Sequence, residues 1–334
     1  MTGTGAARWR PWRWPAWLPL LVLAPLISGC SPWPWGPAKV RLGITDWPGY
    51  EYFYLAQEWE LAEGIELQVN QHSSLKDQRF SYEQGDVDAI TTTLTEALAI
   101  CQEMPPRCPQ LVLVLDESVG GDQLIAQRRV SDLAALRGET VGLERSVLGE
   151  YLLLRALETV DLRLGDVKLV YDGPRALIDQ FRDRSLAAVV TYPPYSDSLV
   201  NADAHHLLFS SSQLPGEVVD VLAVSPAFAR HHPQRVEALV ATWWAARDQA
   251  RRRPDQAVAL MARREGVSVE AFRRSEALLR YVEPRLQWDW LRPGGRLETR
   301  LKAMARRLQM AGRLLPTMPL PRANPRWAQV TPGP

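Results

Sequence analysis

The sequence predicts an α/β fold of two lobes, in which each lobe is a mostly parallel sheet flanked by helices. Residues 41–98 alternate between strand-like and helix-like stretches, which is typical of a βαβ unit. The run LVLVL at 111–115 is continuously apolar, as in a parallel strand buried on both faces. With 334 residues, of which 46% are hydrophobic and 23% charged, the chain is long enough to form two cores.

The N-terminal residues have the composition of an export signal. Several arginines precede an apolar run from Trp14 to Ile27, which is too short and too rich in proline for a stable membrane span. We therefore expect a signal peptide over 1–29. The ending LISGC resembles a bacterial lipobox, which implies lipidation of Cys30 and a periplasmic protein anchored to the inner or the outer membrane; an ordinary signal peptide with an incidental cysteine is the alternative. Residues 30–38 then form a tether without regular structure.

Two further cysteines, Cys101 and Cys108, enclose the segment QEMPPR. Disulfides persist in exported proteins, so we expect a structural bridge between them. Metal ligation by two lone cysteines is the weaker alternative, because no histidine lies beside them in the sequence.

The first lobe is expected to comprise 39–122 and 218–320. Its first strand starts near Arg41 and leads into a loop that carries Trp47 and Tyr50. Ligands of open α/β sheets bind outside the carboxyl ends of the strands, so this loop should face a cleft and expose both rings to a ligand. The elements expected next are a helix over 51–63, a strand over 65–69, a helix over 78–85 and a strand over 87–91.

The second lobe is expected over 123–217. Its strands are predicted at 124–126, before residue 144, at 166–170 and at 187–190, with helices after Ser146 and over 174–184. Arg145 and Ser146 precede a helix, where backbone N–H groups favour an anion, although Ser146 could equally be a plain N-cap. Tyr192 and Tyr195 either stack on a ligand opposite Trp47 or only pack their loop.

The strand expected at 218–224 returns the chain to the first lobe. It carries Asp220, a plausible partner for a cationic ligand. The two crossings, near Asp122 and Glu217, are what a closing clamshell needs. Beyond Pro233 we expect helices, including one over 297–315, and a C-terminal tail, 321–334, that lies extended on the surface.

Three segments carry a family resemblance: WPGY at 47–50, YLAQEWELAEGIELQV at 54–69 and GDVDAITTTLTEAL at 85–98. In this order they resemble the periplasmic solute-binding proteins of ABC importers for nitrate, sulfonate, taurine and thiamine precursors (the NMT1/SsuA/TauA-like group). The resemblance runs from about residue 39 to about residue 319. It implies a type II periplasmic-binding-protein fold with the ligand cleft between the lobes, and a monomer that binds no cofactor.

The resemblance also implies site residues. It places Thr92 and Thr93 at the cleft, where their hydroxyls either cap a helix or bind a polar ligand group. The segment from Asp116 to Asp122 matches the pattern D-x-S-x-G-x-D, which borders the site in the family and makes Asp116 and Ser118 candidates; solvated turn residues are the alternative. Residues 187–193 depart from the family pattern, because alanine stands at 187 where aspartate is usual.

The function implied is a lipid-anchored receptor that captures a sulfonate, a nitrate-type anion or a thiamine-precursor-like molecule and delivers it to a permease and its ATPase. One alternative is an envelope sensor without transport, and another is an enzyme like the pyrimidine-precursor synthases, whose cysteine-rich iron motif is missing here. Aromatic and acidic residues favour an amine-bearing or zwitterionic solute, whereas Arg145 favours an anion.

Other functional classes receive no support from the sequence. A net charge of +1 does not indicate a nucleic-acid partner. The sequence contains no P-loop, HExxH, GxSxG or GxGxxG motif, and adjacent histidine pairs without a third ligand do not indicate a metal.

Overall fold

The computed structural model describes residues 1–3, 5, 38–200 and 204–331. The chain divides into two units, residues 1–35 and 36–334, and every described helix and strand lies in the second. The predicted lipidation site Cys30, the apolar run of the signal peptide and the tether up to residue 37 lie outside the described residues.

The first sheet defines lobe 1. Its strand order is β11-β4-β10-β3-β1-β2, and β12 pairs with β4. Its strands are β1 (Ala38–Ile44), β2 (Ile65–Gln71), β3 (Ala89–Thr93), β4 (Gln110–Ser118), β10 (Val219–Val224), β11 (Leu279–Tyr281) and β12 (Arg322–Ala323). Strands β1, β2 and β3 run parallel, as a βαβ unit requires, whereas β10 runs antiparallel to both β3 and β4 because it returns from the other lobe.

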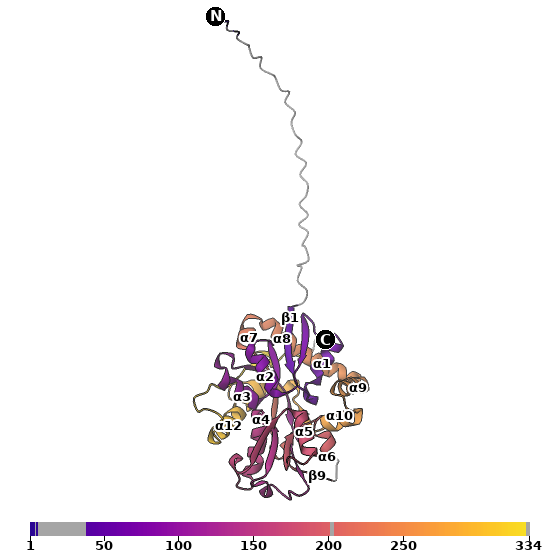
Figure 1. Cartoon of the computed structure of the whole chain (residues 1–334). Coiled ribbons are helices and arrows are strands. Elements are labelled where there is room, and N and C mark those ends of the chain that lie inside the picture. The colour runs from indigo at the N-terminus through magenta and orange to yellow at the C-terminus, as the bar shows by residue number, and fades with distance from the viewer. Residues whose placement is uncertain (4, 6–37, 201–203, 332–334) are drawn as a thin grey trace. The chain divides into compact units, whose positions relative to one another are not determined.

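The second sheet defines lobe 2 and has the order β7-β6-β8-β5-β9. Its strands are β5 (Gln123–Gln127), β6 (Thr140–Glu144), β7 (Lys168–Asp172), β8 (Ala188–Thr191) and β9 (His205–Ser210). Again the strands inside the lobe, β6, β7 and β8, are parallel, and the entering strand β5 is antiparallel to its neighbours. In Figure 1 the part with α1, α2, α3 and α8 lies above the part with α4, α5, α6 and β9.

Helices cover both faces of each sheet. Lobe 1 contains α1 (Glu51–Glu58), α2 (Leu75–Gln84), α3 (Leu94–Glu103), α7 (Pro226–His231), α8 (Pro233–Arg252), α9 (Pro254–Glu265), α10 (Val269–Glu276), α11 (Gln287–Leu291) and α12 (Arg296–Met310). Lobe 2 contains α4 (Val147–Glu158), α5 (Pro174–Arg182) and α6 (Asp197–Val200). Phe53 of α1 and Trp243 of α8 pack on one face of the first sheet, and Leu98 of α3 and Leu301 of α12 pack on the other.

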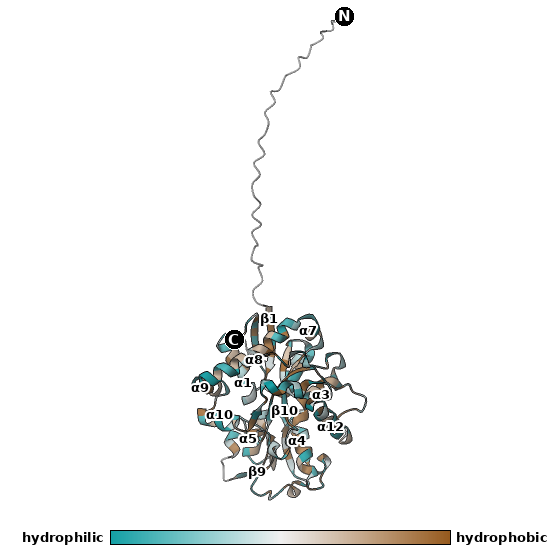
Figure 2. Cartoon of the chain, turned by 180° about the vertical axis from the view of Figure 1, so that it is seen from behind, coloured by the Kyte–Doolittle hydropathy of each residue, from teal (hydrophilic) through white to brown (hydrophobic). Residues whose placement is uncertain are grey.

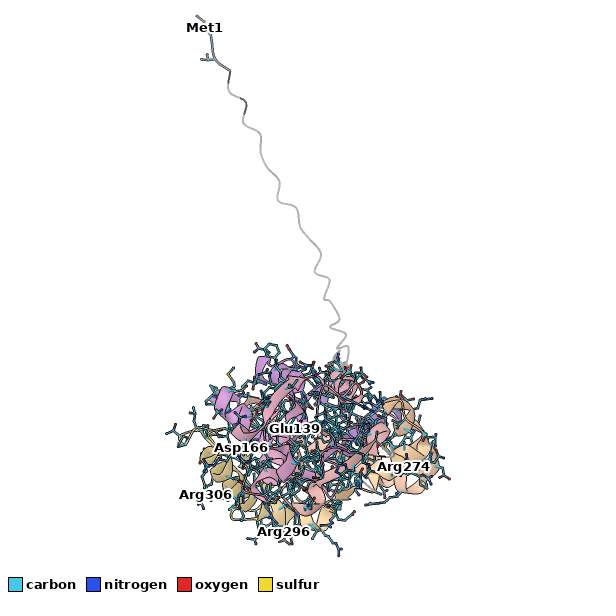
Figure 3. The ribbon with its side chains drawn as sticks, turned by 60° about the horizontal axis from the view of Figure 1, so that its bottom comes forward. Met1, Glu139, Asp166, Arg274, Arg296 and Arg306 are labelled. Carbon is cyan, nitrogen blue, oxygen red and sulfur yellow. A yellow bond between two sulfur atoms is a disulfide. The ribbon has the colours of Figure 1, made fainter. Side chains whose placement is uncertain are left out.

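Trp243 and Trp244 are core residues, since both are buried and pack with the first sheet. Helix α9, at the periphery, is drawn largely in the teal of hydrophilic residues in Figure 2. The labelled Arg274, Arg296 and Arg306 lie at the periphery in Figure 3, and all three side chains are exposed.

Two helices are shorter than the sequence suggested. Helix α1 ends at Glu58, because Glu60 takes a left-handed conformation (φ 52°) and the N–H of Leu61 returns to the carbonyl of Ala56. Helix α12 ends at Met310, shortly before Gly312, whose φ of 69° breaks the helix.

The C-terminal segment also differs from the expected surface tail. Strand β12 pairs with β4, Trp327 is buried, and its indole N–H donates to the carbonyl of Pro233. The reason is that β4 offers a free sheet edge beside β11, which a passing strand can complete.

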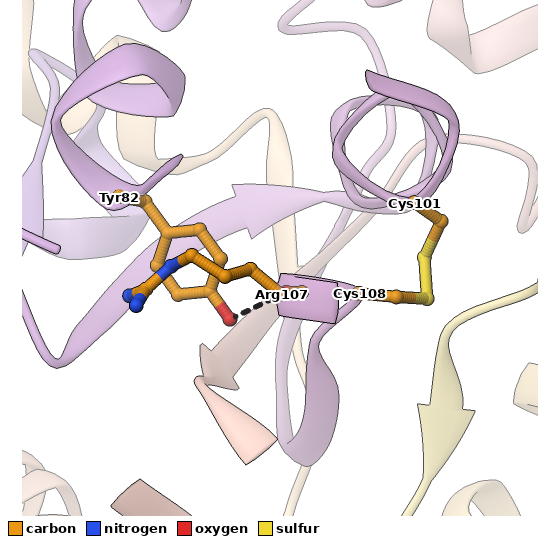
Figure 4. Close-up of a disulfide and its surroundings, with 4 residues drawn as sticks. All are labelled: Tyr82, Cys101, Arg107 and Cys108. Atoms are coloured by element: carbon orange, nitrogen blue, oxygen red, sulfur yellow. Dashed lines mark hydrogen bonds between the residues drawn. A yellow bond between two sulfur atoms is a disulfide. The ribbon is translucent and has the colours of Figure 1, made fainter. Parts of the chain in front are cut away.

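A disulfide joins Cys101, at the end of α3, to Cys108 (Figure 4). Arg107 beside it lies over the ring of Tyr82, and the Tyr82 hydroxyl donates to the Arg107 carbonyl (3.1 Å). The bridge therefore ties the connection between α3 and β4 back to α3, and the contacts of Arg107 with Tyr82 tie the same connection to helix α2.

Candidate ligand-binding site

Two spaces that share the lining residue Asp46 lie between the lobes. The larger is a groove of about 740 Å³, lined mainly by the connection from β2 to α2 in lobe 1 and the connection from β7 to α5 in lobe 2. The smaller is a cavity of about 20 Å³, which has room for about one water molecule. Asp46 lines both spaces, so it stands where the groove meets the cavity.

The small cavity receives side chains from both lobes. Its lining consists of Thr45, Asp46, Trp47, Tyr50, Leu75, Thr93, Asp122, Leu148, Tyr192 and Asp220. Five of the residues that the sequence singled out for ligand binding therefore meet here, namely Trp47, Tyr50, Thr93, Tyr192 and Asp220. Asp122 also lines the cavity. The sequence marked it only as the point where the chain crosses between the lobes, because it follows two glycines in a flexible segment.

Three aromatic rings converge on this cavity. The Trp47 ring centre lies 6.5 Å from that of Tyr50 and 6.1 Å from that of Tyr192, with interplanar angles of 55° and 73°. The sequence suggested an exposed pair, but Trp47 is only 5% exposed and Tyr50 only 2%, because Tyr192 of lobe 2 covers the loop. The indole N–H of Trp47 has no hydrogen-bond partner among the described residues, which is unusual for a buried tryptophan.

Glycine allows the loop to approach this closely. A methyl group at Gly49 would collide with the Asp116 carboxyl and the Trp47 indole, and one at Gly121 would collide with the Trp47 ring. Both turns therefore need a residue without a side chain for the indole and the acid to share this space.

Three buried carboxyl groups lie close to these rings. Asp116 of β4 and Asp220 of β10 are directly paired in the antiparallel register, so their side chains lie on the same face of the sheet. Both are buried, as is Asp122 where the chain enters lobe 2. The Tyr50 hydroxyl donates to Asp220 Oδ1, but Asp220 Oδ2, Asp122 Oδ2 and both oxygens of Asp116 have no partner among the described residues.

Burial shifts the acidity of these groups. It raises the pKa of Asp116 to about 7, despite the lowering influence of Asp220 and the nearby Trp47 indole. It raises the pKa of Asp122 to about 6, and burial together with the Asp116 charge raises that of Asp220. The burial and pairing of these acids cost stability, and Arg247 offsets this only in part at Asp116, so we expect the cluster to serve something other than stability. Strong perturbation inside a cleft is a mark of functional sites.

The other predicted site residues have structural partners. The hydroxyl of Thr93 caps α3 by accepting from the N–H of Glu96 (3.2 Å), although Thr93 also lines the cavity. Thr92 is buried in β3 and lines neither space. Ser118 shares a hydrogen bond with Ser211 (2.8 Å), which links the two segments that cross between the lobes.

Ser146 and Tyr195 lie on the lobe 2 side. Ser146 is the N-cap of α4, where it accepts from the N–H of Gly149 (3.1 Å), and it lines neither space. Tyr195 lines the groove, and its hydroxyl donates to Asp46 Oδ2 (2.8 Å) across the lobes.

Two glutamates that the sequence reasoning missed join the lobes reciprocally. Glu96 of lobe 1 accepts from the N–H groups of Val147 (2.5 Å) and Leu148 (3.1 Å) at the start of α4. Glu144 of lobe 2 accepts from the N–H of Leu75 (2.5 Å) at the start of α2. Burial raises the pKa of both, to about 7 for Glu144. A glutamate three residues after the Thr93 cap was the available signal, but it suggests a local capping box.

These contacts correct the expected anion site. The N-terminus of α4, where an anionic ligand was anticipated, already holds the carboxylate of Glu96. Arg145 is exposed and lies over the ring of Tyr171, 4.7 Å from its centre; it lines the groove but not the small cavity.

Within the described residues, no group of three or more histidine, cysteine, aspartate or glutamate side chains is arranged to hold a metal ion. Nor does any helix of residues 38–200 and 204–331 combine the length and apolarity that a membrane crossing requires.

Comparisons with known proteins agree on the fold. The structure is similar to the alkanesulfonate-binding protein SsuA of Xanthomonas axonopodis pv. citri bound to MOPS, with a TM-score of 0.71, 15% identity and coverage of 85% of this chain and 96% of that one. It is also similar to the desulfurization enzyme DSZB, with a TM-score of 0.58, 16% identity and coverage of 87% and 96%. At such identities the likeness shows the two-lobed fold alone.

At the level of sequence, the chain is 24% identical over 166 residues to a protein of Brucella abortus (strain 2308) that is provisionally named a binding protein. The match covers 47% of this chain, and the chain spans about half the length of that curated relative. The model of the NMT1-like family matches residues 35–263. This match covers more than half of the chain, and the protein belongs to the NMT1-like family.

Proposed function

We propose that this protein is a lipid-anchored solute-binding protein of an ABC-type importer, which captures a small organic solute between its lobes and delivers it to a permease. The observation that carries the proposal is the small interlobe cavity, in which aromatic rings and buried polar atoms without partners converge from both lobes. The classes that the family resemblance offers for the solute are a sulfonate, a nitrate-type anion and a thiamine-precursor-like molecule.

The proposed mechanism is closure. The hinge would lie at the two crossings, near 122/123 and 217/218, where the chain passes between the sheets through short segments. Hydrogen bonds join the two lobes across the gap, among them the one from the Tyr195 hydroxyl to Asp46 and the one from the Leu75 N–H to Glu144. Such contacts can exchange with water when the lobes part. A solute that touches both lobes shifts the population toward the closed form by its difference in affinity for the two forms.

The roles in the site follow from position. Trp47 and Tyr192 would hold the solute between the lobes, Tyr50 and Thr93 would border its polar group, and Asp220 would accept its hydrogen bonds. The proposal assigns no reaction to these groups, which bind and orient. Asp116 does not line the cavity but is paired with Asp220 in the strand register. It would therefore act on the solute only through Asp220.

A thermal-unfolding screen of the full chain in detergent tests the site. We expect at least one solute to raise the unfolding temperature, by an amount that grows with concentration as binding to the folded form requires. Replacing Trp47 by alanine should abolish the shift. Trp288, which is 47% exposed and lies away from the cavity, provides the matched control, and Trp288→Ala should leave the shift intact. A shift that survives Trp47→Ala would show that the site lies elsewhere.

Anchoring and delivery need separate tests. Metabolic labelling with radioactive palmitate should mark the wild type and leave Cys30→Ala unlabelled. Uptake of the identified solute by cells should depend on the protein and on the permease. Uptake that is unchanged without the protein, while binding is intact, would favour the sensor role over transport.

A further inference from the structure

The charge of the small cavity points to the chemical class of its ligand. Three aspartates, Asp46, Asp122 and Asp220, line the cavity, and no lysine, arginine or histidine is among its described lining residues. Asp46 is already paired, with Arg264 at 3.5 Å and with the Tyr195 hydroxyl. The two carboxyls left to meet a ligand are therefore those of Asp122 and Asp220; a cation would favour their ionised forms, whereas an anion would gain no attraction from them.

Of the unsatisfied side-chain atoms on the described lining residues, two are carboxyl oxygens and one is a donor, the indole N–H of Trp47, which lies beside the Asp116 carboxyl. Asp122 Oδ2 and Asp220 Oδ2 are buried and have no partner among the described residues, and both residues line the cavity. Buried acceptors of this kind are satisfied by N–H donors. A positively charged donor gains the most, because charge-assisted hydrogen bonds are about twice as strong as neutral ones.

The rings provide the second half of a cation site. The Trp47, Tyr50 and Tyr192 rings surround the same cavity at mutually tilted angles. Aromatic faces attract cations through their quadrupole, and tryptophan does so best. Rings and carboxylates around one small space form a combination that suits a cationic nitrogen.

The two helix N-termini beside the small cavity are occupied by carboxylates of the protein itself. Three cationic side chains line the outer groove but not the small cavity, namely Lys76, Arg145 and Arg175. Helix N-termini bind anions through free N–H groups, yet those of α4 and α2 donate to Glu96 and Glu144. These two helix starts, which border the small cavity through Leu75 and Leu148, therefore hold internal carboxylates where a sulfonate or nitrate would need them free.

The volumes of the cavity and the groove restrict the chemical class of the ligand further. A cavity of about 20 Å³ accepts a group no larger than a water molecule, which a primary ammonium matches and a trimethylammonium exceeds. The groove of about 740 Å³ begins at Asp46 and has room for a carbon body.

We propose that the solute is a primary amine in its ammonium form, with the charged head between Trp47, Tyr192 and the carboxylates of Asp122 and Asp220 and the body in the interlobe groove. This inference rests on the proposed function, since it takes the small cavity as the capture site.

Probes that share one body and differ only in the head give the sharpest test. The full chain is titrated calorimetrically with butylammonium, butyltrimethylammonium and butane-1-sulfonate, and with the same three heads on longer and cyclic bodies. We expect primary ammonium probes to bind at least tenfold more tightly than their trimethyl counterparts, and the sulfonates not to bind.

Two variants separate the site from nonspecific attraction. Asp220→Asn should weaken ammonium binding at least tenfold, whereas Asp179→Asn, which makes the same chemical change on a side chain that is 78% exposed, should not change it. A urea titration of each variant shows that it is folded. Asp220→Asn should resist urea at least as well as the wild type, because it removes a buried acid that stands opposite Asp116.

The outcomes distinguish the two proposals. Binding of a sulfonate that Trp47→Ala abolishes would overturn the ammonium inference and keep the interlobe capture site. Preference for the trimethyl head would also overturn the inference, since that head exceeds the cavity. If no probe of any class binds in a way that depends on Trp47, both proposals fail.

Discussion

Replacing Asp116 by asparagine should stabilise the protein at alkaline pH, although it removes a charged residue from the proposed site. The carboxyl is buried opposite Asp220 and has no hydrogen-bond partner among the described residues. The other charged groups that act on it are Asp122, which raises its pKa, and Arg247, which lowers it. Asparagine has nearly the same shape and carries no charge, so it avoids the cost of an ionised buried acid.

The magnitude follows from the pKa of Asp116. Its pKa is about 7 in the folded protein, against the usual 3.8. An acid whose pKa is raised by folding holds its proton more tightly when folded, so the free energy of unfolding falls as the pH rises from 3.8 to about 7 and is level above. Between pH 5 and pH 8 the wild type should lose about 2 to 3 kcal/mol that the asparagine variant keeps.

Urea titrations at the two pH values, followed by tryptophan fluorescence, provide the measurement. The quantity to compare is the difference between variant and wild type at pH 8 minus the same difference at pH 5, because this subtraction removes effects of the substitution that do not depend on pH. Asp179→Asn serves as the control and should give a value near zero. If Asp116→Asn also gives zero, Asp116 is ionised and paired in the folded protein, and the description of the acidic cluster is wrong.

Three further outcomes are expected. Replacing both Cys101 and Cys108 by serine should lower the free energy of unfolding by about 2 to 3 kcal/mol, measured with urea, because the bridge closes a short loop, with a sequence separation of 7; an unchanged midpoint would refute this. Trp243→Ala should cost roughly 3 to 5 kcal/mol as a core truncation while ligand affinity stays the same, and a loss of affinity in calorimetry at full folding would place this residue in the site. Glu144→Ala should weaken ligand binding about tenfold and enlarge the protein in solution scattering, since Leu75 then lacks its acceptor across the lobes; equal affinity would show that this contact does not hold the closed form.

Much of the fold was predictable because it depends on local patterns. The apolar run at 111–115 lies inside β4, and the alternation after Gly64 became β2. Hydroxyl residues before apolar stretches became helix caps, as at Thr93 and Ser146. These features need only neighbours in sequence, and period and capping chemistry determine them directly.

The site was harder to predict from the sequence, because it depends on contacts between distant segments. The opposition of Asp116 and Asp220 is a matter of strand register, which no local pattern reveals. Trp47 was expected to be exposed beside proline and glycine, but Tyr192 from the other lobe covers it. Glu96 reads as part of a capping box, and only the docking of the lobes brings it to α4.

The reciprocal placement of Glu96 and Glu144 has a consequence for how the molecule opens. Each lobe lends an acidic side chain to the first turn of a helix in the other, so these two latches point in opposite directions across one gap. A motion that parts the two lobes must break both contacts before the gap is fully open. The helix starts of α2 and α4 then exchange a carboxylate partner for water.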